Sequence, residues 1–332
     1  MDKILFKTDT DGFSKDLHKT IKNTFTKADI KKAVRFLWFK LFFYLSCFLL
    51  SITFLYMNTY SDHVGYLILN YLCIGVSGIL LAFNSSHDAC HENFSKKKWV
   101  NDLIFHFTFN MQGTNARLWK IRHVSSHHLF SNVDGCDADV DDNPLIRFSP
   151  NHSKKWFMKY QHLYAPFLYS LYFVVWIYVK DFVYLNKKNL ANLRNQNYPF
   201  WYTIEFAIWK LVYLSYMIIL PYYLLDFTIL ELLTAYMIMV VVGSNIFIYT
   251  LATTHFTMET EFPTANKEGV LPYNFAEHQL IVSIDYHPTS KIATFLFGGF
   301  NSHAAHHLFS NLPHTIYPKI TPVIVEKAEV YN

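Results

Sequence analysis

Eight histidines gather in three short segments whose spacing suits metal ligation. The segments read HDACH at residues 87–91, HVSSHH at 123–128 and HAAHH at 303–307. Residues three and four apart share one face of a helix, so each segment can aim two or three imidazole rings at one point. Imidazole suits iron, zinc, copper and nickel. Eight rings exceed the ligands of one first-row ion, which predicts two metal ions bound by His87, His91, His123, His127, His128, His303, His306 and His307.

The elements that must carry these histidines are apolar. Of the 332 residues, 52% are hydrophobic and 16% are charged, against roughly 25% charged in soluble domains. Four runs, at 34–57, 64–83, 200–225 and 228–253, are long enough to cross the ~30 Å hydrocarbon core. The pattern predicts an all-α integral membrane fold, with four transmembrane helices and a cytosolic helical cap formed by residues 84–199 and 254–332. One domain is expected over residues 1–332.

A fifth apolar stretch, residues 163–185, carries Pro166, Lys180 and Asp181. If the three histidine segments form one site, they lie on the same side of the membrane. The chain must then cross the membrane an even number of times between the second and third segments, and the hairpin 200–253 supplies two crossings. The fifth stretch is therefore expected in the membrane interface, where aromatic residues collect. Lys40, inside the first run, is expected to snorkel to that interface.

Charge placement predicts the orientation. Residues 1–35 hold eight lysines and Arg35, whereas the expected outer links, 58–63 and 221–227, hold no basic residue. The positive-inside rule then puts both termini and all histidine segments in the cytosol, in the endoplasmic reticulum or a bacterial inner membrane. Within the N-terminal segment 1–33, Phe13, Leu17, Ile21 and Phe25 form the apolar stripe of a basic amphipathic helix. It is expected to lie on the membrane surface, with packing inside the protein as the alternative.

Composition also excludes several classes. The net charge of +4 is too small for a nucleic-acid-binding surface. The four cysteines have neither zinc nor redox spacing, so a disulfide framework is not expected. No signal-peptide pattern opens the sequence.

The three histidine boxes, their spacing around paired spans, and the continuations HHLFSNVDGCDADVDDNPLIRFSP and HHLFSNLPHTIYPKITPVIVE resemble the membrane fatty-acid desaturase and hydroxylase superfamily. Its members are non-haem di-iron enzymes, and the resemblance runs from about residue 13 to residue 325. It implies a ninth ligand, His255, just beyond the last span, and a supporting place for His278 in AEHQL. The third box resembles methyl-end desaturases, whereas the regions around box two and FAEHQL resemble front-end or acyl-CoA desaturases. Leu251 stands where the stearoyl type has a water-binding asparagine.

Ligating histidines usually donate their second ring N–H to a carboxylate or carbonyl. Asp88, Asp137 and Asp139 lie near the boxes and are the expected acceptors. Arg117, Lys120 and Arg122 precede box two and are candidates for an anionic head group, although a positive-inside flank explains them equally well. The remaining histidines, His314 among them, are not expected to take part.

The resemblance implies a cis double bond formed in a fatty acyl chain, as acyl-CoA or acyl-lipid, with two iron ions, dioxygen and two electrons. The sequence holds no haem-binding HPGG segment and no flavin or nicotinamide fingerprint. The expected donor is therefore external, a cytochrome-b-type haem protein or a ferredoxin with its reductase. Three alternatives stay open: a hydroxylase acting on acyl, sterol or carotenoid substrates, a zinc-dependent membrane hydrolase, and a non-catalytic scaffold.

Overall fold

The computed structural model describes residues 4–57, 63–140 and 143–331, and most of these residues are helical. In these residues the extended pairing is limited to two isolated bridges. Four helices are long and apolar enough to cross a membrane: Lys27–Tyr56, Val64–Cys90, Phe200–Leu224 and Ile229–His255. The all-α membrane fold with four candidate spans is thereby confirmed. The expected outer link 58–63 lies outside the described residues except for His63.

The first span, α2 (Lys27–Tyr56), begins earlier than its apolar run. Thr26 and Asp29 form a capping box that satisfies the first backbone N–H groups. Lys40, in the middle of this helix, has no exposed surface, so the expected snorkelling is wrong. Its amino group instead donates to the Thr294 carbonyl at 3.1 Å. This backbone oxygen is the hydrogen-bond acceptor that water or a head group would provide at the membrane interface.

The second and third spans each contain a π-helical turn, whereas the fourth is a continuous α-helix. The second consists of α3 (Val64–Leu81), the π-turn η1 (Ala82–Ser86) and α4 (His87–Cys90). The third consists of α11 (Phe200–Leu214), η5 (Ser215–Ile219) and α12 (Leu220–Leu224), and the fourth is α13 (Ile229–His255). Gly75 permits close packing of α3 on α13, because a Cβ there would lie 2.5 Å from Cγ of Met239.

The fifth apolar stretch folds as a bent pair of helices. It comprises η3 (Trp156–Tyr160), α8 (Gln161–Ser170), α9 (Tyr172–Val175), η4 (Trp176–Lys180) and α10 (Asp181–Asn186), with a bend of 65° at Leu171. Asp181 accepts a hydrogen bond from Lys210 of α11 at 2.7 Å. This buried ion pair fixes the stretch to the third span; its interfacial place stays a prediction.

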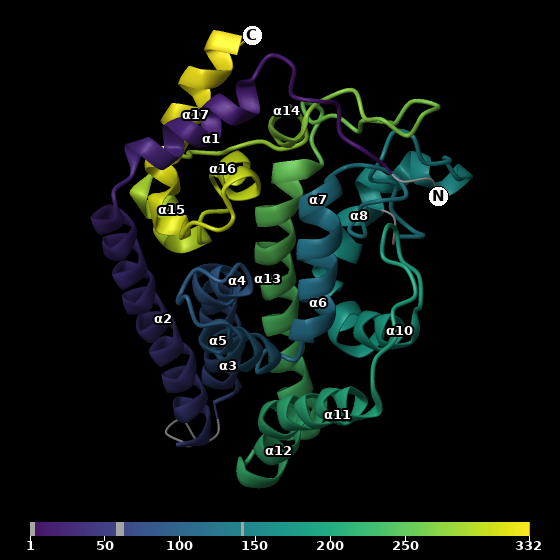
Figure 1. The fold of residues 1–332 in the computed structure, drawn as a ribbon. Helices are drawn as coiled ribbons and strands as arrows, with labels where there is room; N and C mark the ends of the chain where they lie inside the picture. The colour runs from purple at the N-terminus through teal and green to yellow at the C-terminus, as the bar shows by residue number, and fades with distance from the viewer. Residues whose placement is uncertain (1–3, 58–62, 141–142, 332) are drawn as a thin grey trace.

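The cap is made of two parts. The part before the third span contains α5 (Lys98–Asn110), α6 (Ala116–Arg122), the π-turn η2 (His123–His127) and α7 (His128–Phe130), and α5 lies beside α3 and α4 in Figure 1. The C-terminal part lies at one end of the bundle, at the top of Figure 1. From the C-terminal part come α14 (Phe275–Ile281), α15 (Lys291–Phe297), α16 (His303–Leu308), η6 (His314–Ile316) and α17 (Tyr317–Tyr331).

The N-terminal helix α1 (Phe13–Thr24) packs inside the protein. Phe13, Leu17 and Ile21 are buried in one apolar cluster with Ile320 and Ile324 of α17, and the two helices lie side by side in Figure 1. The expectation that this apolar stripe rests on the membrane is therefore wrong, and the packed alternative holds. The stripe has the same period in both cases, so the pattern alone does not separate them.

Candidate metal centre

Box one continues the second span, at the end that the predicted orientation places in the cytosol. His87 opens α4, which is a single turn, and His91 follows it directly. The π-turn before it coincides with two hydrogen bonds from the Asn84 side-chain amide, to the Leu80 and Leu296 carbonyls. Gly298 has φ +61° and lies so close that a Cβ there would be 2.0 Å from the Phe83 oxygen. The loop before box three thus packs directly on the helix that carries box one.

Box two is positioned by a cap and a π-turn. The Asn115 side chain accepts the Leu118 N–H at 3.0 Å and begins α6. Within η2 the helix widens, as π-turns often do at functional sites. His123 and His128, five apart, then point into one cluster, and His127 points into another. A regular α-helix would instead align His123 with His127.

Box three lies on α16, whose N-terminus is held by Asp285. This carboxylate accepts the N–H of Ala304 at 2.9 Å, and burial raises the pKa of Asp285 to about 6. His303 and His307 share one face of the short helix, and His306 points to the other cluster. His255, the last residue of α13, is held by a 2.8 Å contact between its Nδ1 and the Val282 carbonyl.

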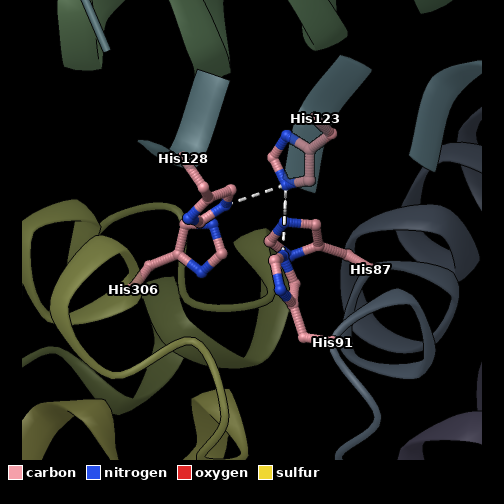
Figure 2. Close-up of side chains that lie close together, drawn as sticks. All are labelled: His87, His91, His123, His128 and His306. Carbon is pink, nitrogen blue, oxygen red and sulfur yellow. Dashed lines mark hydrogen bonds between the residues drawn. The ribbon is translucent and has the colours of Figure 1, made fainter. Parts of the chain in front are cut away.

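Five rings form the first cluster, shown in Figure 2. The Nε2 atom of His123 lies 3.0 Å from that of His87, 3.2 Å from that of His91 and 3.1 Å from that of His128. His306 completes the group, with its ring centroid 4.4 Å from that of His87. We call this the five-histidine cluster: His87, His91, His123, His128 and His306.

Four rings form the second. The Nε2 atom of His255 lies 3.1 Å from that of His127, 3.1 Å from that of His307 and 2.7 Å from that of His303. We call this the four-histidine cluster: His127, His255, His303 and His307. The structure therefore brings all nine predicted histidines into two adjoining groups.

Hydrogen bonds alone cannot account for these short distances between ring nitrogens. A ring nitrogen carries either one proton or one lone pair, yet the Nε2 atoms of His123 and His255 each meet three others. In addition, Nε2 of His306 is buried with no hydrogen-bond partner among the described residues. Two imidazoles bound at right angles to one metal at about 2.1 Å would have nitrogens about 3.0 Å apart. The donor sets therefore fit one metal ion in each cluster.

Burial favours the neutral, metal-binding form of the rings. It lowers the pKa of His91 to about 4 and the pKa of His123, His128 and His306 well below the ordinary value. His127 differs. Burial acts to lower its pKa, but the charge of Asp137 and the hydrogen bond to it raise the pKa above its ordinary value.

The expected outer carboxylates have different roles. Asp137 meets Nδ1 of His127 at 3.0 Å and also accepts the Asn132 N–H at 2.9 Å. Asp139 lies 3.9 Å from that Nδ1 and is engaged at 2.6 Å by Arg122. Asp88 contacts His314, not a box histidine: its carboxylate meets the His314 Nδ1 at 2.5 Å. One step along a helix turns a side chain by about 100°, which directs Asp88 away from the rings of His87 and His91.

His278 belongs to neither cluster. Its Nε2 meets the Ser131 carbonyl at 2.9 Å, and burial lowers its pKa to about 4. Its neighbour Gln279, which the sequence analysis missed, contacts Nδ1 of His307 at 2.9 Å. The signal available was its place beside His278 in AEHQL.

The three candidate head-group residues all meet carboxylates. Arg122 is buried, bonds Asp139 and lies over the Tyr184 ring, so it acts inside the protein. Arg117 lies 3.7 Å from Glu205, and Lys120 lies 3.3 Å from Asp102. The last two keep exposed surface, and their head-group role stays a prediction.

An apolar cavity lies among the spans. Its wall on the second span runs from Ile74 to Ala82, about 12 Å along a helix. Phe247 lines its rim and stacks on Phe83, with centroids 6.1 Å apart. Phe300 contacts Phe83 at 5.0 Å and His87 at 4.4 Å, so a chain of aromatic rings joins the cavity to the five-histidine cluster.

Residues 63–332 match the family model for fatty acid desaturases. This chain belongs to the fatty acid desaturase family. The match includes all nine histidines and three of the four candidate spans. It confirms the family resemblance and, with the four apolar helices, makes the chain a membrane protein of an oxidoreductase family.

Curated relatives support the same family. An sn-1 linoleoyl-lipid 6-desaturase from Arthrospira platensis is 28% identical over 79% of this chain and 70% of its own length. A probable Delta(5) fatty acid desaturase C from Dictyostelium discoideum is 28% identical over 84% and 63%. An acyl-lipid (8-3)-desaturase from Mortierella alpina is 28% identical over 85% and 62%. The chain thus spans about two thirds of the length of these desaturases.

Proposed function

We propose that this protein is an acyl desaturase that introduces a cis double bond into a fatty acyl chain, using dioxygen and two electrons. The proposal names two iron ions, one in each histidine cluster, with the nine clustered histidines as ligands. When bound, such an iron pair supplies the oxidising power that removal of hydrogen from an unactivated methylene requires.

The observation that carries the proposal is the pair of hubs at His123 and His255. Each hub gathers three further ring nitrogens within 3.2 Å or less, in a buried and mostly neutral environment. Neutral nitrogen ligands without a carboxylate in either group leave a metal pair highly charged, which suits oxygen chemistry. A hydrolytic zinc site instead needs one ion with an open position.

The chain's own residues would bind and orient the substrate. The apolar cavity can hold part of an acyl chain out of water, because its lining residues on α3 and α13 present hydrocarbon. Phe83, Phe247 and Phe300 lie between the cavity and His87 and would determine which carbon approaches the cluster. The relatives' names support an acyl-lipid substrate, in which the carrier is a membrane lipid.

The electrons would come from an external cytochrome-b-type haem protein or a ferredoxin with its reductase. We further propose that the histidine clusters and both termini face the cytosol. The basic residues of segment 1–35 support this orientation, and the packing of α1 on α17, near the C-terminal boxes and at the top of Figure 1, agrees with it.

Expression in yeast that lacks its own desaturase, with mass spectrometry of the lipids, tests the function. We expect a new double bond with the wild-type chain, none with His127→Ala, and wild-type product with the control His18→Ala, because His18 lies outside both clusters, with its Nδ1 on the Ser14 carbonyl and its ring on Phe309. A product that has gained an oxygen atom would instead show a hydroxylase. Unchanged lipids with well-expressed wild-type protein and an active donor would contradict the proposal.

A further inference from the structure

A buried lysine, histidine and aspartate connect the first span to box one. Nζ of Lys40 lies 2.6 Å from Nε2 of His314, and Nδ1 of His314 lies 2.5 Å from Asp88. The three residues are at most 2% exposed. With the Lys40 amino group as the donor, Nε2 of His314 accepts and its Nδ1–H donates to the carboxylate. The three side chains therefore form one continuous hydrogen-bonded path from the first span to box one.

Stability alone does not explain such a group inside a membrane helix. Replacing a buried ion pair by apolar residues is often neutral or stabilising. An ionisable residue within a span is therefore a functional candidate, and its partner indicates where it acts. Here the hydrogen-bonded path from Lys40 through His314 ends at Asp88, the residue next to His87 of the five-histidine cluster.

Box one lies where the second span ends, so contacts beyond the helix help to fix its position. The helix α4 stops at Cys90, before His91, and Glu92 turns the chain at φ +64°. Asp88 also accepts the backbone N–H of His314 at 3.0 Å. Asn93 reinforces the link by donating to the carbonyls of Ser310 and Leu312 at 3.0 and 3.2 Å.

We infer that His314, supported by Lys40, is a positioning residue that holds box one against the segment following box three. Through this contact His87 and His91 keep their places relative to His306 in the five-histidine cluster. Lys40 also ties the first span to this contact. Its amino group donates to the Thr294 carbonyl, and Tyr44, one turn further along the span, donates to the Phe295 carbonyl at 2.6 Å. The part concerning metal retention rests on the proposed function.

Two substitutions at His314 separate positioning from folding. In His314→Asn the amide nitrogen occupies the place of Nδ1 and keeps the Asp88 contact. In His314→Gln the amide reaches toward Lys40 and loses Asp88. The readout is backbone hydrogen exchange of residues 84–94 in the purified full chain, measured by mass spectrometry. We expect exchange about 10-fold faster in His314→Gln and in Lys40→Met, and near wild type in His314→Asn.

Lys210→Met is the matched control, because Lys210 is also a buried lysine in a span and bonds Asp181. Asp181 accepts the N–H of Asn115, at the start of α6. We expect this variant to speed exchange in residues 116–128 and to leave residues 84–94 unchanged. Wild-type exchange of 84–94 in His314→Gln and Lys40→Met, or equal acceleration there in Lys210→Met, would overturn the inference.

Iron retention provides the second readout. We expect His314→Gln to release one of its two irons to a chelator about 10-fold faster than His314→Asn does. Equal release from the two variants would overturn the role in the metal site. If the wild-type chain itself held no iron, the proposed function would fail, whereas the exchange comparison would still decide the positioning role.

Discussion

The two histidine clusters use the same ring but hold it in different ways. In the four-histidine cluster, Nδ1 atoms of three rings meet Asp137, Gln279 and the Val282 carbonyl. In the five-histidine cluster, aromatic rings cover the ligands: Trp119 stacks on His123 at 4.3 Å, and Phe300 stacks on His87 at 4.4 Å.

This difference shows that a ligand ring can be oriented either by a hydrogen bond to its far nitrogen or by packing on its face. A hydrogen bond to an anion also makes the ring a stronger electron donor. The clusters are therefore expected to differ in metal affinity and in their sensitivity to substitution.

Removing a hub ring should have the largest effect. His123→Ala deletes the nitrogen that the other rings of the five-histidine cluster surround, and His255→Ala does the same in the four-histidine cluster. Each variant should lose one iron per chain and should lower product formation by more than the roughly 10–100-fold that an outer contact costs. Metal analysis and lipid mass spectrometry measure both effects. Retention of two irons in both variants would contradict the assignment of one iron to each cluster.

Asp137→Asn should come next. The substitution removes the negative charge beside His127 and should weaken metal binding in the four-histidine cluster by roughly 10–100-fold, with the other cluster unchanged. Asp134→Asn is the matched control, because Asp134 lies in the same loop and contacts Ser149. Chelator competition on both variants measures the effect, and equal losses would remove the special role of Asp137.

Phe300→Leu tests the ring packing. It should cost about 1 kcal/mol through loss of the stacked contact with His87, which corresponds to about fivefold faster iron release from the five-histidine cluster. Phe300 also stacks on His303 at the longer distance of 6.0 Å, so release from the four-histidine cluster should change less. Faster release from that cluster alone would contradict the comparison.

Gln279→Met should have the smallest effect. It removes the neutral hydrogen bond to His307, at about 1 kcal/mol or less, and two longer contacts, with Ser131 and the His128 carbonyl, and should loosen mainly the four-histidine cluster. Gln161→Met provides the control, because Gln161 bonds only the Arg147 backbone. Equal losses of metal affinity in Gln279→Met and Asp137→Asn would show that the negative charge of Asp137 adds nothing beyond a hydrogen bond.

The apolar runs predict the spans because length and composition suffice to cross a membrane. The spacing of the boxes predicts that the histidines gather, but not their partition, since the π-turn η2 changes which residues share a side. The burial of Lys40 and the contact of His314 with Asp88 could not be predicted for a related reason. Their partners, Thr294 and Asp88, lie more than two hundred residues away in sequence, and no local pattern contains that contact.

The central claim is that the nine rings hold two iron ions. Metal analysis of the purified wild-type chain, combined with iron X-ray absorption spectroscopy, tests it most directly. We expect two irons per chain, each surrounded mainly by imidazole nitrogen. One zinc per chain, or iron bound chiefly by carboxylate oxygen, would contradict it.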